Sequence, residues 1–340
     1  MRSEHSDLAY HLTKFFTVYL PGQRNLSHGT VVAYRDAFRL LLQFCAEKRN
    51  IKPNNLSLDD INHSCIKEFL LWLKEERHNN ASTCNQRLAA ISSFFIYLQY
   101  EQPERMLQCK QCLDIKSMKT SSPPLRYLTV DGIKLLLSQP DISTKYGRRD
   151  LAILSVLYDT GARVQEVSNI NLGDLRLISP ATLRLIGKGN KARVVPLLTG
   201  TSEILKQYIK DFRLDYLGEE TPLFQNRKHE RMGRYGIAYV LKSYADKARK
   251  QSPDLIPDTI SPHVIRHSKA MHLLQANVNL VYIRDLLGHC NVKTTEIYAR
   301  ADNTLKREAL EKANPIKHKL DTPDWSNDDG LMEWLRNLGK

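Results

Sequence analysis

Residues 261–300 place the tightest constraint on this chain; they read SPHVIRHSKAMHLLQANVNLVYIRDLLGHCNVKTTEIYAR. The side chains in this stretch that can do chemistry are His263, Arg266, His267, His289 and Tyr298. A guanidinium offers a planar, permanently charged fork to phosphate oxygens. An imidazole moves a proton near neutral pH, and a phenol can act as a covalent nucleophile. Held in one helical hairpin, these groups suit phosphoryl transfer onto a tyrosine.

The net charge of the chain points to a polyanionic partner. The formal charge of the 340 residues is +13 at pH 7. An excess of this size favours nucleic acid, although basic soluble proteins without such a partner exist. No apolar run reaches membrane-spanning length, and the polar N-terminus differs from a secretory signal. We therefore expect a cytoplasmic protein that does not associate with a membrane.

The cysteines and histidines give weak signals for a metal. The six cysteines are scattered, which favours free thiols in a reducing compartment. Cys109 and Cys112 have zinc-ligand spacing, but no second cysteine pair does, so we interpret them as ordinary thiols. His263 and His267 have the i, i+4 spacing of zinc ligands. Arg266 between them would repel a cation. The chain has no P-loop and no carboxylate cluster for magnesium ions, so we expect no metal and no other cofactor.

The first hundred residues predict a helical domain. Amphipathic helices are expected over 7–19, 28–48, 66–76 and 82–100, with Ser27 as an N-cap. Arg87, in the polar start of the fourth helix, is a candidate DNA contact, with a solvated face as the alternative. The Pro-Pro pair at the end of residues 113–125 cannot continue a helix. We therefore predict a helical domain at 1–112, a linker at 113–125 and a second domain at 126–314.

The second domain mixes helices with a few strands. Thr129 is a predicted N-cap for a helix over 130–137. Three short runs have β character, and a Gly-Asn turn between the last two predicts an antiparallel hairpin; the runs are 175–178, 182–186 and 193–197. The remaining pattern is helical to about residue 313. The expected fold class is mainly α with one small antiparallel β-sheet.

Two further sets of charged residues precede the 261–300 stretch. Arg163 follows a glycine break at the start of a helix, where amides and the helix dipole favour an anion. Glu166, three residues later, lies on the same face and would orient it. Lys188 stands at the predicted hairpin tip between glycines that allow close approach to a ligand. Plain solvation is the alternative for Lys188. Lys191 and Arg193 add charge to the same tip and are candidate DNA contacts.

Four motifs occur in a fixed order: TGARVQEV, GKGNKARVVPL, HVIRHS and LLGHCNVKTTEIY. In this order they resemble the tyrosine recombinase (phage integrase) family, above all its Xer-like and mobile-element members. The resemblance covers most of residues 126–300, and the N-terminal region is loosely similar to the family's helical core-binding (SAM-like) domain. It assigns the family's catalytic positions to Arg163, Lys188, His263, Arg266, His289 and Tyr298. Ser268-Lys269 departs from the small or aromatic apolar pair that is commoner there.

The resemblance implies a site-specific DNA recombinase that works without metal or ATP. Tyr298 would attack the scissile phosphate and form a 3′-phosphotyrosyl bond. The phosphate oxygens would be bound by Arg163, Arg266 and His289. Lys188 would protonate the leaving 5′-oxygen, and His263 would accept the phenol proton or bind phosphate. The two domains would form a C-shaped clamp around double-stranded DNA, and a homotetramer would join two inverted-repeat sites through a Holliday junction.

Several readings of the biological role stay open. We favour integration, excision or transposition of a mobile element, because the chain has an extra C-terminal segment. Xer-like resolution of chromosome or plasmid dimers is the alternative within the family. Three alternatives lie outside the family: a type IB topoisomerase, a non-catalytic DNA-binding regulator and a zinc hydrolase. A topoisomerase would relax DNA without site preference, and a regulator would bind DNA without cleaving it. A zinc hydrolase would lose activity to chelators.

The C-terminal segment, residues 315–340, predicts a short helix on an acidic tail. Residues 321–340 hold five acidic and two basic side chains, a net charge of −3. An apolar stripe at helical spacing is formed by Leu331, Met332, Trp334, Leu335 and Leu338. So short a helix is marginal alone and requires a groove. We expect it to dock in trans on a neighbouring protomer; folding onto its own domain is the alternative.

Overall fold

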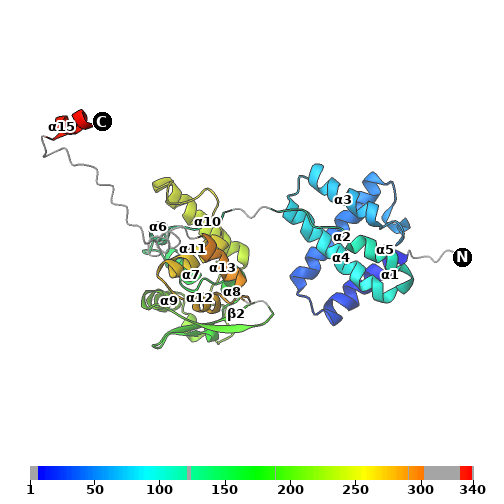
Figure 1. Ribbon diagram of the computed structural model, residues 1–340. Helices are drawn as coiled ribbons and strands as arrows, with labels where there is room; N and C mark the ends of the chain where they lie inside the picture. The colour runs from blue at the N-terminus through cyan, green and yellow to red at the C-terminus, as the bar shows by residue number, and fades with distance from the viewer. Residues whose placement is uncertain (1–6, 121–123, 188, 290, 302–329, 339–340) are drawn as a thin grey trace. The chain divides into compact units, whose positions relative to one another are not determined.

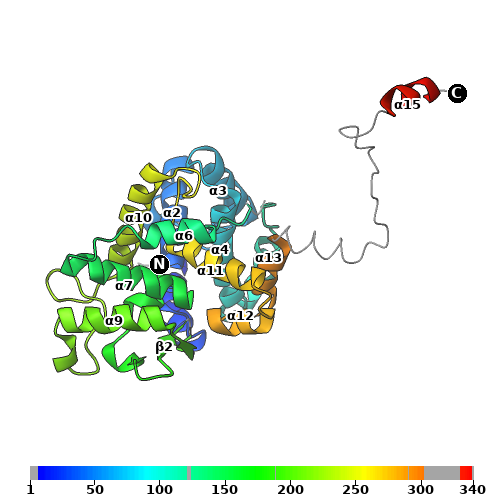
Figure 2. The ribbon, with the colours of Figure 1, turned by 90° about the vertical axis from the view of Figure 1, so that its left-hand side faces the viewer.

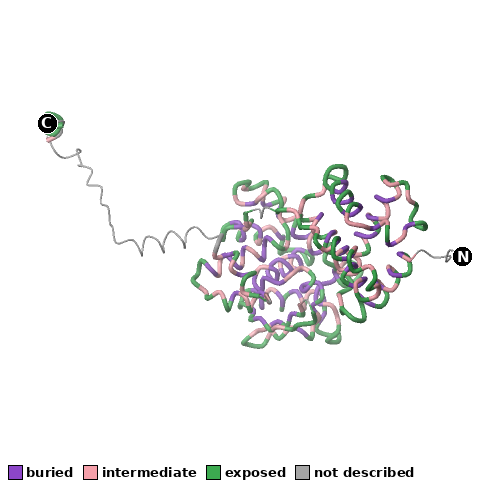
Figure 3. Tube along the Cα trace, turned by 45° about the vertical axis from the view of Figure 1, so that its right-hand side comes forward, coloured by how far each residue is buried: buried purple, intermediate pink, exposed green. Residues whose placement is uncertain are grey.

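The computed structural model describes residues 7–120, 124–187, 189–289, 291–301 and 330–338. The chain divides into two compact units, residues 1–123 and residues 124–340. Buried positions lie inside each unit, and exposed positions cover it (Figure 3). In the described part of the chain, no helix has both the length and the apolar character needed to cross a membrane.

Helices are the only regular secondary structure among the described residues of the first unit. Its longer elements are α1 (Asp7–Lys14), η1 (Phe15–Gln23), α2 (His28–Lys48), α3 (His63–Glu75), α4 (Ala81–Glu101) and α5 (Met106–Leu113). The short 3-10 turns η2 (Pro53–Asn55) and η3 (Pro103–Arg105) each begin with proline. The predicted helices over 28–48, 66–76 and 82–100 are confirmed, with α3 starting three residues earlier than predicted.

Asparagine caps account for two of these helix starts. The side chains of Asn62 and Asn80 accept hydrogen bonds from the Cys65 and Thr83 amides, at 3.0 and 2.8 Å. Each satisfies an amide that has no partner within its helix. Ser27 precedes α2 with an extended backbone but makes no side-chain cap bond. It occupies the predicted cap position without the predicted hydrogen bond.

The predicted helix over 7–19 changes type partway along. After Lys14 the backbone continues as the π-helix η1, which contains Pro21. Proline has no N–H to donate, so regular α-helical bonding cannot continue through it. The wider turn still buries Phe15, Tyr19 and Leu20 in the core of the first unit.

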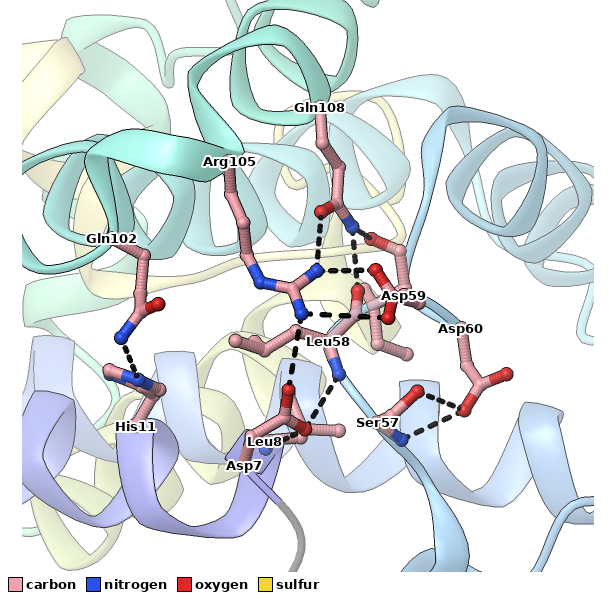
Figure 4. Close-up of polar contacts among 11 residues, drawn as sticks. Asp7, Leu8, His11, Ser57, Leu58, Asp59, Asp60, Gln102, Arg105 and Gln108 are labelled. Atoms are coloured by element: carbon pink, nitrogen blue, oxygen red, sulfur yellow. Dashed lines mark hydrogen bonds and ion pairs between the residues drawn. The ribbon is translucent and has the colours of Figure 1, made fainter.

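A polar network joins α1, the η2–α3 loop and the start of α5 (Figure 4). The Arg105 guanidinium forms ion pairs with Asp59 and with Asp7, the latter at 3.5 Å. The Asp7 carboxylate in turn accepts a hydrogen bond from the Leu58 amide at 3.0 Å. Gln108 Nε2 donates to the Leu58 carbonyl oxygen at 2.6 Å. Both ends of the first unit are thereby held to the same loop.

The first half of the predicted linker packs on the first unit. Ile115 and Met118 lie against its hydrophobic core. The Asn85 side chain forms two hydrogen bonds with the backbone of Met118, at 2.8 and 2.9 Å. The first unit thus extends past the expected boundary at residue 112, because these apolar side chains continue its core. Residues 121–123, which include the Pro-Pro start, lie outside the described residues.

The second unit surrounds a larger core with helices and one small sheet (Figures 1 and 2). The sheet has the order β1-β2-β3, with β1 (Leu175–Arg176), β2 (Thr182–Ile186) and β3 (Ala192–Pro196). All pairings are antiparallel, and Leu183 pairs with Val195 in the predicted hairpin, which is confirmed. The helices are α6 (Val130–Leu137), α7 (Lys145–Thr160), α8 (Val164–Ser168), α9 (Thr199–Asp211), α10 (Arg234–Gln251), α11 (Pro262–Gln275), α12 (Leu280–Leu287) and α13 (Lys293–Ala301). The predicted Thr129 cap is also confirmed, because its hydroxyl accepts from the Gly132 amide at 3.1 Å.

Helix α11 organises the part of this unit that carries the predicted chemistry. It packs against α7 and also contacts α12 and α13. Helix α7 ends at Gly161 in the left-handed conformation, and α12 ends at Gly288 in the same way. Two chain reversals therefore bring their following residues to α11. In the tail, α15 (Leu331–Asn337) is described, whereas residues 302–329 lie outside the described part.

Two glycines in the first turns of helices test how tightly the start of α7 is packed. A Cβ added at Gly147 in α7 would lie 1.9 Å from the Asp141 carbonyl oxygen, whereas at Gly200 in α9 it would meet nothing within 4 Å. We expect Gly147→Ala to destabilise the second unit by about 3 kcal/mol and to lower its melting temperature by about 6–12 °C. Gly200→Ala should be neutral or stabilising by about 0.5 kcal/mol. Scanning calorimetry of the full chain measures both, and equal melting temperatures would contradict the packing at Gly147.

Candidate active site

Arg266 lies at the centre of the predicted catalytic residues and is buried. Its Nη1 donates to the Gly161 carbonyl oxygen and its Nη2 to the Leu287 carbonyl oxygen, both at 2.7 Å. Burial, together with the charge of Arg163, lowers the pKa of Arg266 to about 10. The guanidinium therefore stays a cation at neutral pH. It ties the end of α7 to the end of α12.

Tyr298, on α13, is the buried phenol of the site. Its side chain packs with Met271, Ile283 and Leu287. The phenol oxygen lies 3.0 Å from His267 Nδ1, within hydrogen-bond distance. Burial raises the pKa of Tyr298, and the charges of Arg266 and Arg163 oppose that rise. The phenol is therefore protonated at neutral pH, and the His267 imidazole lies within hydrogen-bond distance of its oxygen.

His289 follows the left-handed Gly288 and faces the same cluster. Its ring lies parallel to that of Tyr298, with 6.3 Å between the centroids. Its Nδ1 is 2.9 Å from Thr295 Oγ1. Burial and the nearby charges of Arg266 and Arg163 lower the pKa of His289 to about 4. At neutral pH this imidazole is uncharged, with one N–H to donate.

Glu166 holds two arginines from different elements. The Arg163 amide and Nη1 both donate to its carboxylate at 2.9 Å. Arg193, on β3, binds the two carboxylate oxygens through Nη1 and Nη2, at 3.1 and 2.8 Å. Burial alone would raise the pKa of Glu166, but the bonds from Arg193 and Arg163 lower it. The predicted orienting role of Glu166 toward Arg163 thus has a direct contact behind it.

Arg193 also fixes the Gly288-His289 turn. Its Nε donates to the Leu286 carbonyl oxygen at 2.9 Å. A Cβ at Gly288 would lie 2.8 Å from Arg193 Nη1, and the Gly288 φ of +65° also disfavours other residues. The Arg193 side chain is only 13 % exposed. These bonds already occupy all three guanidinium nitrogens of the predicted DNA contact Arg193, and its role at DNA stays a prediction.

A hollow of about 420 Å³ opens beside this cluster. It is lined by Arg163, Gly187, Lys191, Arg193, Gly288 and His289, among others. Cationic side chains outnumber carboxylates in this lining, which also includes Asp285, and an excess of cations suits an anion. Arg163 remains 35 % exposed there in spite of its pairing with Glu166. The hollow therefore exposes part of the cationic cluster to solvent.

The other predicted residues are placed less closely. His263 is exposed, with its ring centroid 6.5 Å from that of His267. Lys188 lies outside the described residues, and Lys191 is exposed at the hairpin. In the first unit, Arg87 Nη1 donates to the Ala33 carbonyl oxygen at 3.1 Å. The DNA-contact roles of Arg87 and Lys191 stay predictions.

The described residues hold no cluster of three or more side chains suited to a metal. His267 Nδ1 lies beside the Tyr298 hydroxyl, so this nitrogen already has a partner. Cys109 and Cys112 are buried in the core of the first unit, and burial raises the pKa of Cys112 to about 12. Thiols held in the protonated form are poor metal ligands.

Two partners in this site were not found from the sequence. Thr295 contacts His289, and Arg193 contacts Glu166 across 27 residues of chain. The first had a local signal, because Thr295 stands one helical turn before Tyr298. The second had none, because a long-range ion pair depends on how β3 packs beside α8.

The sequence matches the phage integrase family over residues 126–304 and the phage integrase N-terminal SAM-like domain over residues 14–102. The putative integrase/recombinase y4rC of Sinorhizobium fredii is 35% identical, over 99% of this chain and 100% of its own length. The tyrosine recombinase XerC of Herpetosiphon aurantiacus is 34% identical, over 85% of this chain and 90% of its own. The chain belongs to the phage integrase family and is a tyrosine recombinase, an enzyme that cleaves and rejoins DNA.

Solved structures share the fold. The XerH site-specific recombinase, in a post-cleavage complex with a palindromic difH substrate, aligns with a TM-score of 0.69 at 20% identity, over 92% of both chains. The Tn1549 transposon integrase, in complex with a circular intermediate DNA, aligns with a TM-score of 0.66 at 18% identity, over 91% of this chain and 99% of its own. Likeness at this identity establishes the architecture of the chain.

Arg193 and Lys191 form a matched pair for testing the hairpin. Arg193→Ala leaves buried Glu166 with one arginine fewer, so we expect a loss of about 3 kcal/mol in stability and slower DNA cleavage. Lys191→Ala should leave stability unchanged and lower the salt dependence of DNA binding by about one phosphate contact. Melting curves and binding titrations at several salt concentrations measure these effects. Loss of salt dependence in Arg193→Ala with unchanged stability would show that Arg193 binds DNA instead.

Proposed function

We propose that this chain is a site-specific recombinase that exchanges DNA strands through a 3′-phosphotyrosyl bond to Tyr298. The observation that carries the proposal is the placement of the Tyr298 hydroxyl 3.0 Å from His267 Nδ1, inside a cluster anchored by Arg266. A nucleophile, a proton acceptor and phosphate-binding cations are the parts that such a transfer requires. We further propose that the two domains clamp double-stranded DNA, as the resemblance to tyrosine recombinases implies.

The phosphate would be held by three side chains. Arg163 and Arg266 bind its non-bridging oxygens, where negative charge grows in the transition state. His289 donates a further hydrogen bond from its uncharged ring. Their support is the cation-rich hollow that Arg163 and His289 line. Groups already in position lose little free energy to reorganisation when the reaction occurs.

Protons would move at the two ends of the reaction. His267 Nδ1, rather than His263, accepts the phenol proton as the Tyr298 oxygen bonds to phosphorus, because His267 is within hydrogen-bond distance of that oxygen. His263 then serves as a phosphate donor at the edge of the site. Lys188 gives a proton to the leaving 5′-oxygen, so neither a metal ion nor ATP is required. The phosphotyrosyl bond keeps the free energy for religation.

The biological role we favour is integration, excision or transposition of a mobile element in the bacterial cytoplasm. Its support is the full-length similarity to a protein described as a putative integrase/recombinase. Xer-like dimer resolution is the second candidate, favoured by the similarity to XerC. In both, four protomers would join two inverted-repeat sites through a Holliday junction.

Strand exchange between two duplexes tests the proposal. Duplexes are selected from a randomised library by binding to the full chain, and two labelled copies are then mixed with it. We expect Holliday junctions and recombinant strands with the wild-type protein. Tyr298→Phe should bind these duplexes equally and give neither product. Relaxation of supercoiled DNA without strand exchange would indicate a topoisomerase instead.

The pH dependence of cleavage tests the proton acceptor. Burial, with the neighbouring His263 and Arg266, lowers the pKa of His267 below its ordinary value of 6.5. His267 is therefore neutral at pH 7, and the cleavage rate should fall as acid protonates it. Single-turnover cleavage between about pH 5 and pH 8, where histidine is the group that titrates, measures this fall. In His267→Asn the rate should be lower and the fall absent; an unchanged fall would assign proton acceptance to another group.

The tail would make the active site depend on assembly. Trp334, Leu335 and Leu338 are exposed on and beside α15. An apolar hollow of about 400 Å³ between β3 and α12 is lined by residues that include Val194, Leu273 and Tyr282. We infer that α15 enters this hollow on a neighbouring protomer, because a helix this short gains stability from a groove.

Removal of residues 321–340 tests docking in trans. The deletion should leave binding to one DNA site intact, weaken the complex that joins two sites, and change the cleavage rate. Trp334→Ala in the full chain should reproduce the loss, since a large aromatic side chain anchors such contacts. Native gels with one-site and two-site DNA show both effects. Unchanged synapsis and recombination in the deletion would refute docking in trans.

A further inference from the structure

Thr295 has an unusual position for a polar side chain in this site. It is fully buried on α13, one helical turn before Tyr298. Its hydroxyl oxygen lies 2.9 Å from His289 Nδ1, and within the described residues the structure gives it no second side-chain hydrogen bond. The preceding Thr294 is exposed. Only the buried member of this threonine pair reaches the site.

The contact determines which nitrogen of His289 carries the proton. A neutral imidazole has one N–H and one acceptor nitrogen. If Nδ1–H donated to Thr295, the buried hydroxyl hydrogen would lack an acceptor among the described residues, and Nε2 would present a lone pair. If the hydroxyl donates to Nδ1, both groups are satisfied and Nε2 carries the hydrogen. An unsatisfied buried donor costs about 1–3 kcal/mol, so the second arrangement is favoured.

We propose that Thr295 is a positioning residue that holds His289 in the tautomer with hydrogen on Nε2, ready to donate to the scissile phosphate. The proposal rests on the phosphate-binding role proposed above for His289. An Nε2 lone pair would instead repel a phosphate oxygen. Because the His289 pKa is about 4, the ring cannot avoid this choice by taking a second proton at neutral pH.

The hydrogen bond between Thr295 and His289 also links His289 to α13, the helix that carries the proposed nucleophile Tyr298. Thr295 and Tyr298 lie on one face of α13, three residues apart. A displacement of α13 that withdrew Tyr298 would also withdraw the hydroxyl from His289 Nδ1. The tautomer suited to phosphate would then lose its support. Nucleophile and N–H donor are thereby set together by the seating of one helix.

Three single variants of the full chain test the proposal. Cleavage is measured in single turnover with a library-selected duplex that is nicked so the covalent adduct accumulates. Thr295→Val keeps the shape and removes the hydroxyl, and it should slow adduct formation about 10- to 100-fold, as loss of a partner behind a functional imidazole does. Thr295→Ser should restore most of the rate. Thr294→Val is the matched control and should equal wild type.

A double-variant cycle separates positioning from plain packing. In a His289→Ala background, Thr295→Val should cause no further loss, because the imidazole it serves is gone. The same loss in both backgrounds would overturn the proposal and assign Thr295 to packing. Equal rates for wild type and Thr295→Val would overturn it as well. If the wild-type protein forms no adduct, the proposed function and the inference both fail. If it forms the adduct and Thr295→Val is equally fast, only the inference fails.

Nitrogen NMR of the wild-type protein tests the tautomer directly. With labelled histidine, the His289 resonances are identified by their absence in His289→Ala. We expect an unprotonated Nδ1 and a protonated Nε2 at neutral pH. The opposite tautomer in the wild-type protein would overturn the proposal whatever the kinetics show.

Discussion

The buried guanidinium of Arg266 fixes the geometry on which the rest of the candidate active site depends. It is 3 % exposed and donates to the carbonyl oxygens of Gly161 and Leu287. These carbonyls belong to the ends of α7 and α12, and Arg163 and His289 each stand two residues beyond. A buried cation is tolerated only when it is hydrogen-bonded. The bonds that satisfy Arg266 therefore also set the positions of Arg163 and His289, the two other groups proposed to bind phosphate.

The charge balance around this anchor explains why an anion is the expected ligand. Glu166 forms ion pairs with both Arg163 and Arg193, so one negative charge balances only one of two positive charges. With Arg266, the site has a surplus of positive charge that is largely withdrawn from water. A phosphodiester gains negative charge as a nucleophile attacks it, and fixed cations in a poorly hydrated site stabilise that charge strongly. The neutral His289 adds a donor without adding to the repulsion among the arginines.

The sequence predicted much of what local pattern determines, although the Ser27 cap bond is absent and the helix over 7–19 changes type after Lys14. Helical spacing, the Thr129 cap and the hairpin turn are local signals, and all three appear in the structure. The catalytic positions were predicted from ordered motifs, which do not show contacts. The bond between His267 and Tyr298 spans 31 residues and the Glu166–Arg193 pair 27, so both required the packed fold. For the same reason charge alone suggested a DNA contact at Arg193, where the fold gives it a buried partner.

The proposed mechanism requires that Tyr298 becomes covalently bound to DNA. Its most direct test is to trap the adduct on a nicked duplex, digest the protein, and locate the nucleotide on a peptide by mass spectrometry. We expect a nucleotide attached to the Tyr298 oxygen through the 3′-phosphate of the cleaved strand. A nucleotide on any other side chain, or attachment through a 5′-phosphate, would contradict it.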